Sequence, residues 1–162
     1  MRQSAQILLT SFFLLMVTFY FSVGQEGYRF EEDTRLPATP VKSQGKTGTC
    51  WVFATHSLLE SELLRSGREA YDLSEMFVVR QSYLERARLF VRFHGHLNFG
   101  PGAQAWDVIH VLEKDGLVPQ SVLPGLKMDD RKHNHREMDA ALKGYMKSII
   151  ETDGGALSPV WN

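Results

Sequence analysis

The sequence predicts one mainly helical domain, for three reasons. A chain of 162 residues has the size of a single domain, since domains commonly contain about 100 to 200 residues. Apolar residues recur at helical spacing in four stretches. No series of short alternating segments indicates a set of strands. The charges nearly cancel, with 18 lysine and arginine against 19 aspartate and glutamate residues, so nucleic acid is not expected as a partner.

The first 24 residues have the layout of a secretory signal peptide. An almost unbroken apolar run covers residues 7–23 behind Arg2, and the small residues Ser22 and Gly24 close it. This pattern predicts cleavage after Gly24 and a secreted or periplasmic protein. The run is slightly shorter than the roughly 20 residues of a membrane span, so a membrane anchor formed by residues 7–23 is the alternative.

A polar lead-in segment is expected over residues 25–39. Pro37 and Pro40 favour an extended course, because proline restricts both its own backbone and that of the residue before it. Val41 is expected to open a short strand ahead of a glycine-containing turn.

Two helices are expected in the next part of the chain. The first begins at Thr49 and ends near Gly67. The second begins near residues 72–74, where Asp72 with Glu75 fits a capping box, and runs toward His94.

Two further helices follow. The third covers residues 104–115, with Gly116 as its C-cap and Pro119 beyond it. The fourth begins near Asp129 and has the clearest periodicity. The apolar positions that define the third are Trp106, Val108, Ile109 and Leu112, and those that define the fourth are Met138, Leu142, Tyr145 and Ile149.

Cys50 is the single cysteine of the chain and follows a turn containing Gly45 and Gly48. A lone cysteine in an exported protein is either free or bonded to another molecule, or it is a small buried apolar residue. A helix N-terminus favours the nucleophilic thiolate, and Cys50 is expected at such a terminus. The Gln44 amide and the Cys50 backbone N–H could together donate to a developing oxyanion.

The stretch "QGKTGTCWVFA", residues 44–54, resembles the active-site segment of papain-like cysteine peptidases. The segments "DLSEMF", "NFGPG" and "EKDGLVP" resemble later elements of that family. The segments "TPVKSQGKTGTCW", "YDLSEMFVVR", "LKGYMKSII" and "LSPVW" are similar to the bleomycin hydrolase and aminopeptidase C branch. The resemblance covers about residues 38–162.

The resemblance implies an α+β, papain-like fold with a helical left domain and a β-rich right domain. Residues 40–126 would form the helical half, and residues 127–162 would begin an inserted helical segment. The right domain would be largely missing. Its histidine and asparagine are expected about 130 to 150 residues after the cysteine, beyond Asn162.

The resemblance also implies roles for particular residues. Cys50 would be the nucleophile and Gln44 the oxyanion donor, while Trp51 would pack beside the site and shield it. Gly100 and Gly102 would lie along the substrate cleft, although Ala103 stands where the family usually has a second consecutive glycine.

The implied activity is that of a cysteine peptidase of the aminopeptidase type, which hydrolyses peptide bonds through an acyl-enzyme. No cofactor and no metal are implied, since acyl transfer to a thiolate needs neither. The expected partner is a peptide substrate, and the intact protein of this branch often forms a homo-oligomer. The chain alone is expected to be an inactive fragment. The alternatives are a non-catalytic papain-like half-domain that binds a partner, and a helical domain with a buried structural cysteine.

The six histidines are expected to lie on helix sides or in solvated loops, without a role as base or metal ligand. No zinc-like spacing of cysteines or carboxylates accompanies them. They are His56, His94, His96, His110, His133 and His135.

Overall fold

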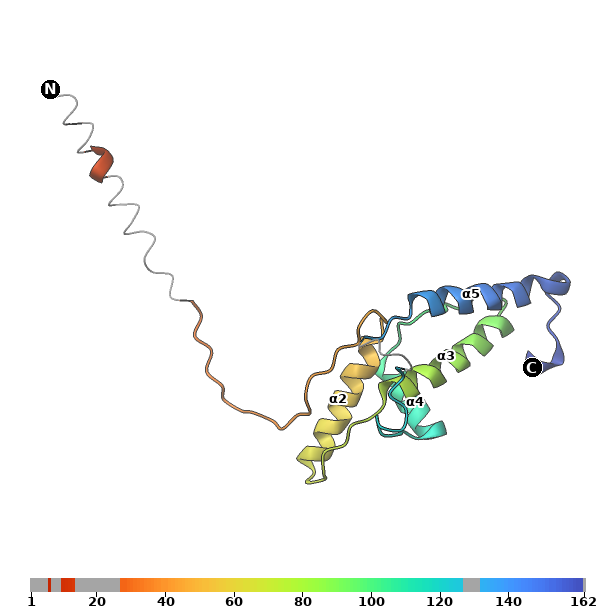
Figure 1. The fold of residues 1–162 in the computed structure, drawn as a ribbon, viewed down its shortest axis with the longest axis horizontal. Coiled ribbons are helices and arrows are strands. Elements are labelled where there is room, and N and C mark those ends of the chain that lie inside the picture. Colours follow the sequence, from red (N-terminus) through yellow and green to blue (C-terminus); the bar gives the residue numbers. More distant parts are fainter. Residues whose placement is uncertain (1–5, 7–9, 14–26, 127–131, 162) are drawn as a thin grey trace. The chain divides into compact units, whose positions relative to one another are not determined.

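The computed structural model describes residues 6, 10–13, 27–126 and 132–161 (Figure 1). The chain divides into two compact units, residues 1–35 and 36–162. Most of the predicted signal peptide, residues 1–24, falls outside the described residues, as does Asp129. Within the described ranges, no helix is long and apolar enough to cross a membrane.

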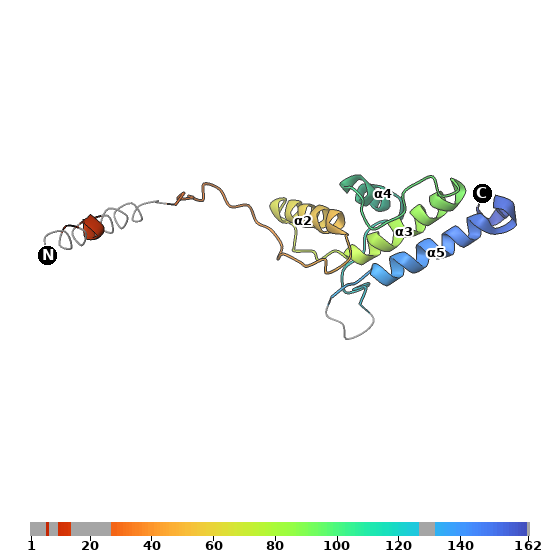
Figure 2. The same cartoon turned by 90° about the horizontal axis from the view of Figure 1, so that it is seen from above.

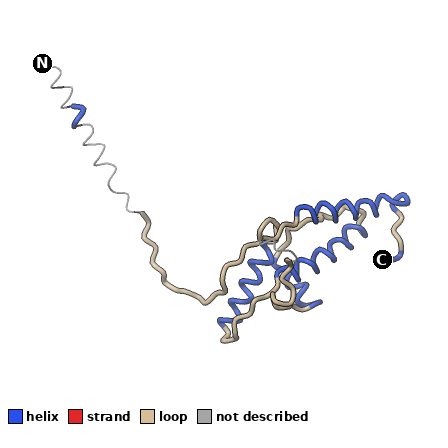
Figure 3. Tube along the Cα trace, in the orientation of Figure 1, coloured by secondary structure: helices blue, strands red, loops and turns tan. Residues whose placement is uncertain are grey.

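The second unit is helical, as the sequence predicts. Its described residues form α2 (Cys50–Arg65), α3 (Glu75–Arg92), α4 (Ala105–Asp115) and α5 (Arg136–Glu151), followed by the 3-10 helices η1 (Thr152–Gly155) and η2 (Pro159–Trp161). In the part of the chain that Figure 3 colours by structure, no segment is a strand. The strand expected at Val41 is absent, because this side chain is fully exposed and lies against no neighbouring strand.

Helix α3 is the centre of the domain, with α4 on one side and α5 on the other (Figure 2). Its buried residues recur at helical spacing and form a continuous stripe. The helices around it contribute mostly valine and aromatic side chains to one core. The core residues are Trp51, Val52, Met76, Val78, Val79, Tyr83, Phe90, Val91, Phe99, Val108, Val111 and Met146.

The start of α3 lies where the sequence predicts, but its cap differs from the prediction. Its N-cap is Ser74, whose hydroxyl accepts a hydrogen bond from the Phe77 backbone N–H at 3.1 Å. The predicted capping box of Asp72 and Glu75 is wrong, because both carboxylates pair with Lys42 instead.

The start of α5 is later than predicted. The helix begins at Arg136 and not near Asp129, because the backbone of the preceding residues is paired elsewhere. The Lys46 N–H donates to the His133 carbonyl at 2.8 Å, and the His135 N–H donates to the Lys46 carbonyl at 3.2 Å. This parallel bridge holds the residues before α5 against the loop that precedes α2.

Four residues that defined the apolar faces of the predicted helices are exposed: Leu112 and Met138 by a little more than a third, Trp106 and Tyr145 by well over half. Trp106 on α4 is 70% exposed, and Tyr145 on α5 is 64% exposed. Met146, which follows Tyr145 on α5, is buried in the core in place of Tyr145. Periodicity predicts that a helix has an apolar face, but it does not fix which residues at the edge of that face reach the core.

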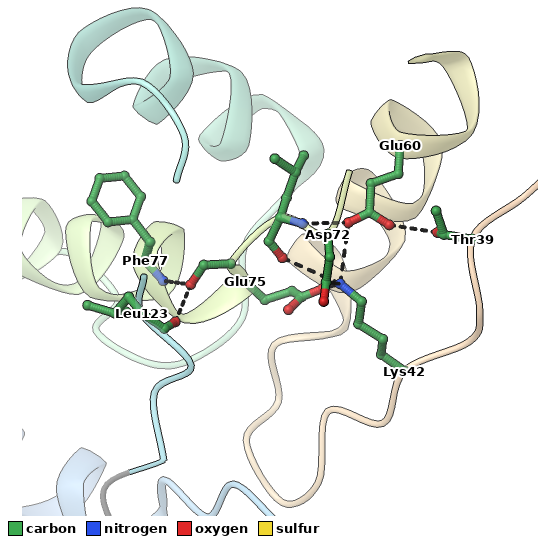
Figure 4. Close-up of polar contacts among 9 residues, drawn as sticks. Thr39, Lys42, Glu60, Asp72, Glu75, Phe77 and Leu123 are labelled. Atoms are coloured by element: carbon green, nitrogen blue, oxygen red, sulfur yellow. Dashed lines mark hydrogen bonds and ion pairs between the residues drawn. The ribbon is translucent and has the colours of Figure 1, made fainter. Parts of the chain in front are cut away.

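One lysine joins three segments of the domain (Figure 4). The Lys42 ammonium lies 2.6 Å from Asp72, 2.8 Å from Glu75 and 3.3 Å from Glu60. Glu60 and Glu75 are almost completely buried. Burial opposes the charge of Lys42, but the hydrogen bonds with Asp72 and Glu75 outweigh it and raise its pKa above the ordinary value.

Glu60 extends this cluster in two directions. Its carboxylate accepts hydrogen bonds from the Thr39 hydroxyl at 2.6 Å and from the Leu73 backbone N–H at 2.8 Å. The lead-in segment, α2 and the chain entering α3 therefore meet at one charged group.

We expect Lys42→Met to lower the free energy of unfolding by about 3 kcal/mol or more, because the variant leaves buried carboxylates without their counter-charge. The measurement is urea unfolding at neutral pH. The control is Arg65→Met on α2, which removes an exposed ion pair with Glu62. It should leave the unfolding midpoint unchanged. Equal losses in the two variants would contradict the importance of the Lys42 cluster.

Candidate active site around Cys50

Cys50 is the first residue of α2, and its side chain is exposed. The hypothesis of a buried structural cysteine is therefore wrong. The first backbone N–H groups of a helix lack partners within the helix, so an anionic group at this position is favoured. Val52, two residues on, is fully buried and fixes this end of α2 to the core.

Two buried threonines shape the loop before Cys50. The Thr47 hydroxyl donates to the Gln44 carbonyl at 2.9 Å, and the Thr47 and Thr49 hydroxyls lie 2.6 Å apart. Both threonines are buried. These hydrogen bonds fold the residues from Gln44 to Cys50 into a tight turn. Sequence reasoning missed this role, because nothing in a lone threonine indicates that its hydroxyl is buried.

Gly45 and Gly48 are required by the conformation of the loop. Both have a φ of +67°, in the left-handed region where a side chain is strained. A Cβ at Gly45 would lie 2.4 Å from the carbonyl oxygen of His133, and one at Gly48 would lie 3.0 Å from Cγ of Pro101. The loop is therefore in close contact with two segments that are distant in sequence.

The Gln44 side chain has an available donor. Its Oε1 is buried and has no hydrogen-bond partner, and no hydrogen bond in the described part of the chain occupies its Nε2 donors. An amide that accepts and donates nothing internally can donate to a bound oxyanion.

The segment from Gly100 to Gly102 lies beside the Cys50 turn. The Trp51 indole N–H donates to the Pro101 carbonyl at 2.9 Å, and the Trp51 ring is buried. A Cβ built at Gly100 or Gly102 meets no atom within 4 Å, so both residues face open space. The structure thus brings Trp51 and this segment together, while their role in substrate binding stays a prediction.

Three of the histidines are not where the sequence suggests. His56 is fully buried in α2, and burial lowers its pKa to about 4. His133 and His135 are partly buried beside Lys46 and are not in a solvated loop, and burial lowers the pKa of each.

None of the six histidines hydrogen-bonds to Cys50 within the described residues. His94 and His96 are exposed after α3, and His110 lies 3.5 Å from Glu85 on the surface. In the same ranges, no three histidine, cysteine or carboxylate side chains gather closely enough to hold a metal ion.

Comparison with known proteins identifies one family. The family model described as papain family cysteine protease matches residues 29–147, which is more than half of the chain. No curated protein matches the chain.

We expect acid to destabilise the protein through His56. The unfolded chain binds a proton on this ring below about pH 6.5, while the folded protein does so only below about pH 4, so stability falls as the pH drops between these values. A pKa shift of this size, about two and a half units, corresponds to a loss of about 3 kcal/mol in the free energy of unfolding once the pH has fallen below both pKa values.

The measurement compares the unfolding free energy of the native protein and His56→Leu from pH 7 to pH 4. As the pH falls, the native protein should lose more unfolding free energy than His56→Leu does. The nearby groups Glu60 and Lys42 are present in both proteins, so the difference between the two curves reports on His56. If the unfolding free energies of the two proteins change with pH in parallel, His56 does not cause the loss of stability in acid.

Proposed function

Because the chain belongs to the papain family of cysteine proteases, we propose that Cys50 is the nucleophile that attacks the peptide carbonyl. The observation that carries this proposal is the exposed sulfur at the first residue of α2. A helix N-terminus provides unpaired N–H groups that favour a negative charge, and a thiolate is the reactive form of cysteine.

The reaction proceeds in two steps. The Cys50 thiolate adds to the carbonyl carbon, and the negative charge that develops on oxygen is stabilised by the Cys50 backbone N–H and the Gln44 side-chain amide. The C–N bond then breaks, and the amine leaves with a proton. Water attacks the resulting thioester, which releases the acid and restores the thiol.

The proton transfers need a base, and none of the described histidines is bonded to Cys50. We therefore infer that the histidine acting on Cys50 comes from a part of the protein outside the described residues. The 162-residue chain by itself should be inactive. This inference is supported by the domain organisation that the family resemblance implies, in which the helical half lacks the base.

The proposed substrate is a peptide with a free amino terminus. Gly100 and Gly102 leave open space beside the Cys50 turn, where an extended peptide could approach the backbone closely. The preference for an amino terminus rests on the similarity of several segments to the bleomycin hydrolase and aminopeptidase C branch.

We expect Cys50→Ala to abolish hydrolysis of aminoacyl amides and Gln44→Ala to lower kcat about 100-fold or more, because the second change removes one oxyanion donor. The control Gln81→Ala removes an amide on α3 that bonds Arg80, and it should not change the rate. The assay compares free and N-acetylated substrates, on this chain and on the gene product extended downstream.

Each outcome of this assay separates two interpretations. Turnover by the short chain would contradict the inference that the base lies elsewhere. Equal rates on free and acetylated substrates would contradict aminopeptidase specificity. Peptide binding that survives in Cys50→Ala, with no turnover by any form of the native protein, would favour the non-catalytic half-domain.

We also propose that residues 1–24 are a signal peptide, supported by the apolar run at residues 7–23 and the small residues before Gln25. The protein recovered from outside the cytoplasm should begin at Gln25 when its amino terminus is sequenced. A membrane-bound product that still begins at Met1 would instead support an anchor.

A further inference from the structure

Two side chains hold three consecutive carbonyl groups of the substrate loop, the segment Gly100–Gly102. Nη1 of Arg86 donates to the Gly100 carbonyl at 3.1 Å and to the Gly102 carbonyl at 2.5 Å. The Trp51 indole N–H donates to the Pro101 carbonyl between them at 2.9 Å. The backbone acceptors of the substrate loop are therefore all occupied from the side of the domain.

Arg86 is itself held firmly by its neighbours. Its Nη2 donates to Asp107 Oδ1 at 2.7 Å, while Asp107 Oδ2 accepts the Gln104 backbone N–H at 3.0 Å, at the start of α4. Burial alone would raise the pKa of Asp107, but the bonds from Gln104 and Arg86 lower it, so the carboxylate stays charged at neutral pH. The guanidinium carbon also lies 5.9 Å from the centroid of the Trp51 ring, as in a cation–π contact.

The substrate loop and the nucleophile are linked through these same residues. Trp51 directly follows Cys50 in α2, and Pro101 packs so closely on Gly48 that a Cβ there would lie 3.0 Å away. The position of the loop relative to the sulfur is thus set by Arg86 on α3, by Asp107 on α4 and by Trp51 on α2. A planar guanidinium can serve two carbonyls and a carboxylate at once, which a lysine ammonium at the same place cannot do with the same geometry.

We propose that Arg86 is a positioning residue: it fixes the substrate loop beside Cys50 and thereby sets how the backbone of a bound peptide lies over the sulfur. This inference rests on the proposed function of Cys50. Arg86 occupies the inner side of the loop, while the outer side at Gly100 and Gly102 is open. A peptide therefore meets a loop whose shape is fixed before binding, which lowers the cost of ordering it.

The test uses the full chain and two reagents with the same reactive group. Methyl vinyl sulfone reports the reactivity of the Cys50 thiol alone. A dipeptidyl vinyl sulfone with a free amino terminus also needs the peptide to be placed correctly. The ratio of the two second-order rate constants isolates placement, because a change in the thiol itself affects both reagents equally.

We expect Arg86→Met to lower this ratio about 10- to 100-fold, because a loop displaced by about 1 Å misplaces the reacting atoms. The rate with methyl vinyl sulfone should not change. Arg86→Lys should give an intermediate ratio, since one ammonium replaces part of the hydrogen bonding. The control is Arg80→Met on the same helix, whose guanidinium bonds the Gln81 side chain at 3.0 Å and not the loop.

The outcomes are distinguishable from a failure of the proposed function. If the native protein shows no preference for the dipeptidyl reagent, the proposed function of Cys50 fails, and this inference fails with it. If the native preference persists in Arg86→Met, the role of Arg86 is refuted while the proposed function stands. Equal losses with both reagents, accompanied by a lower melting temperature, would assign Arg86 a purely structural role. Should Arg86→Met not fold, Arg86→Lys decides: an unchanged ratio overturns the proposal.

Discussion

The ion pairs of the Lys42 ammonium group hold together the amino-terminal half of the domain. The ammonium group is shared by the carboxylates of Glu60, Asp72 and Glu75, and two of these are almost completely buried. A buried carboxylate without a counter-charge is costly, so the chain around Lys42, just after the lead-in segment, lies against α2 and the start of α3. Cys50 begins the same helix, α2, that carries Glu60.

The helices were predictable because their signals are local. Gly67 and Gly116 both have positive φ values at helix ends, where the sequence places the stops. The cap of α3 and the start of α5 were not predictable in the same way. Asp72 and Glu75 have the spacing of a capping box, but Lys42, which is 33 residues before Glu75, pairs with both carboxylates instead. The long-range pairing of Lys46 with His133 similarly delays the start of α5.

In the candidate site, too, the features set by neighbouring residues were predictable and those set by long-range contacts were not. The order of glutamine, glycine, cysteine and tryptophan is visible in the chain, and the placement of Cys50 at a helix start follows from its neighbours. The side chains that hold the site in place could not be predicted from the sequence. Thr47 and Thr49 act through hydroxyls whose burial depends on the fold, and Arg86 reaches the substrate loop from the middle of a helix that sequence patterns identify only as amphipathic.

The contact of Gly45 with the His133 carbonyl bears on the order of events during synthesis. The ribosome releases Gly45 and Cys50 long before the segment that packs against them, and closing so long a loop is slow compared with forming a helix. The turn that carries the thiol therefore reaches its final shape only after the chain through His135 has emerged. A nascent polypeptide therefore exposes the Cys50 sulfur before the bridge between Lys46 and the residues ahead of α5 has formed.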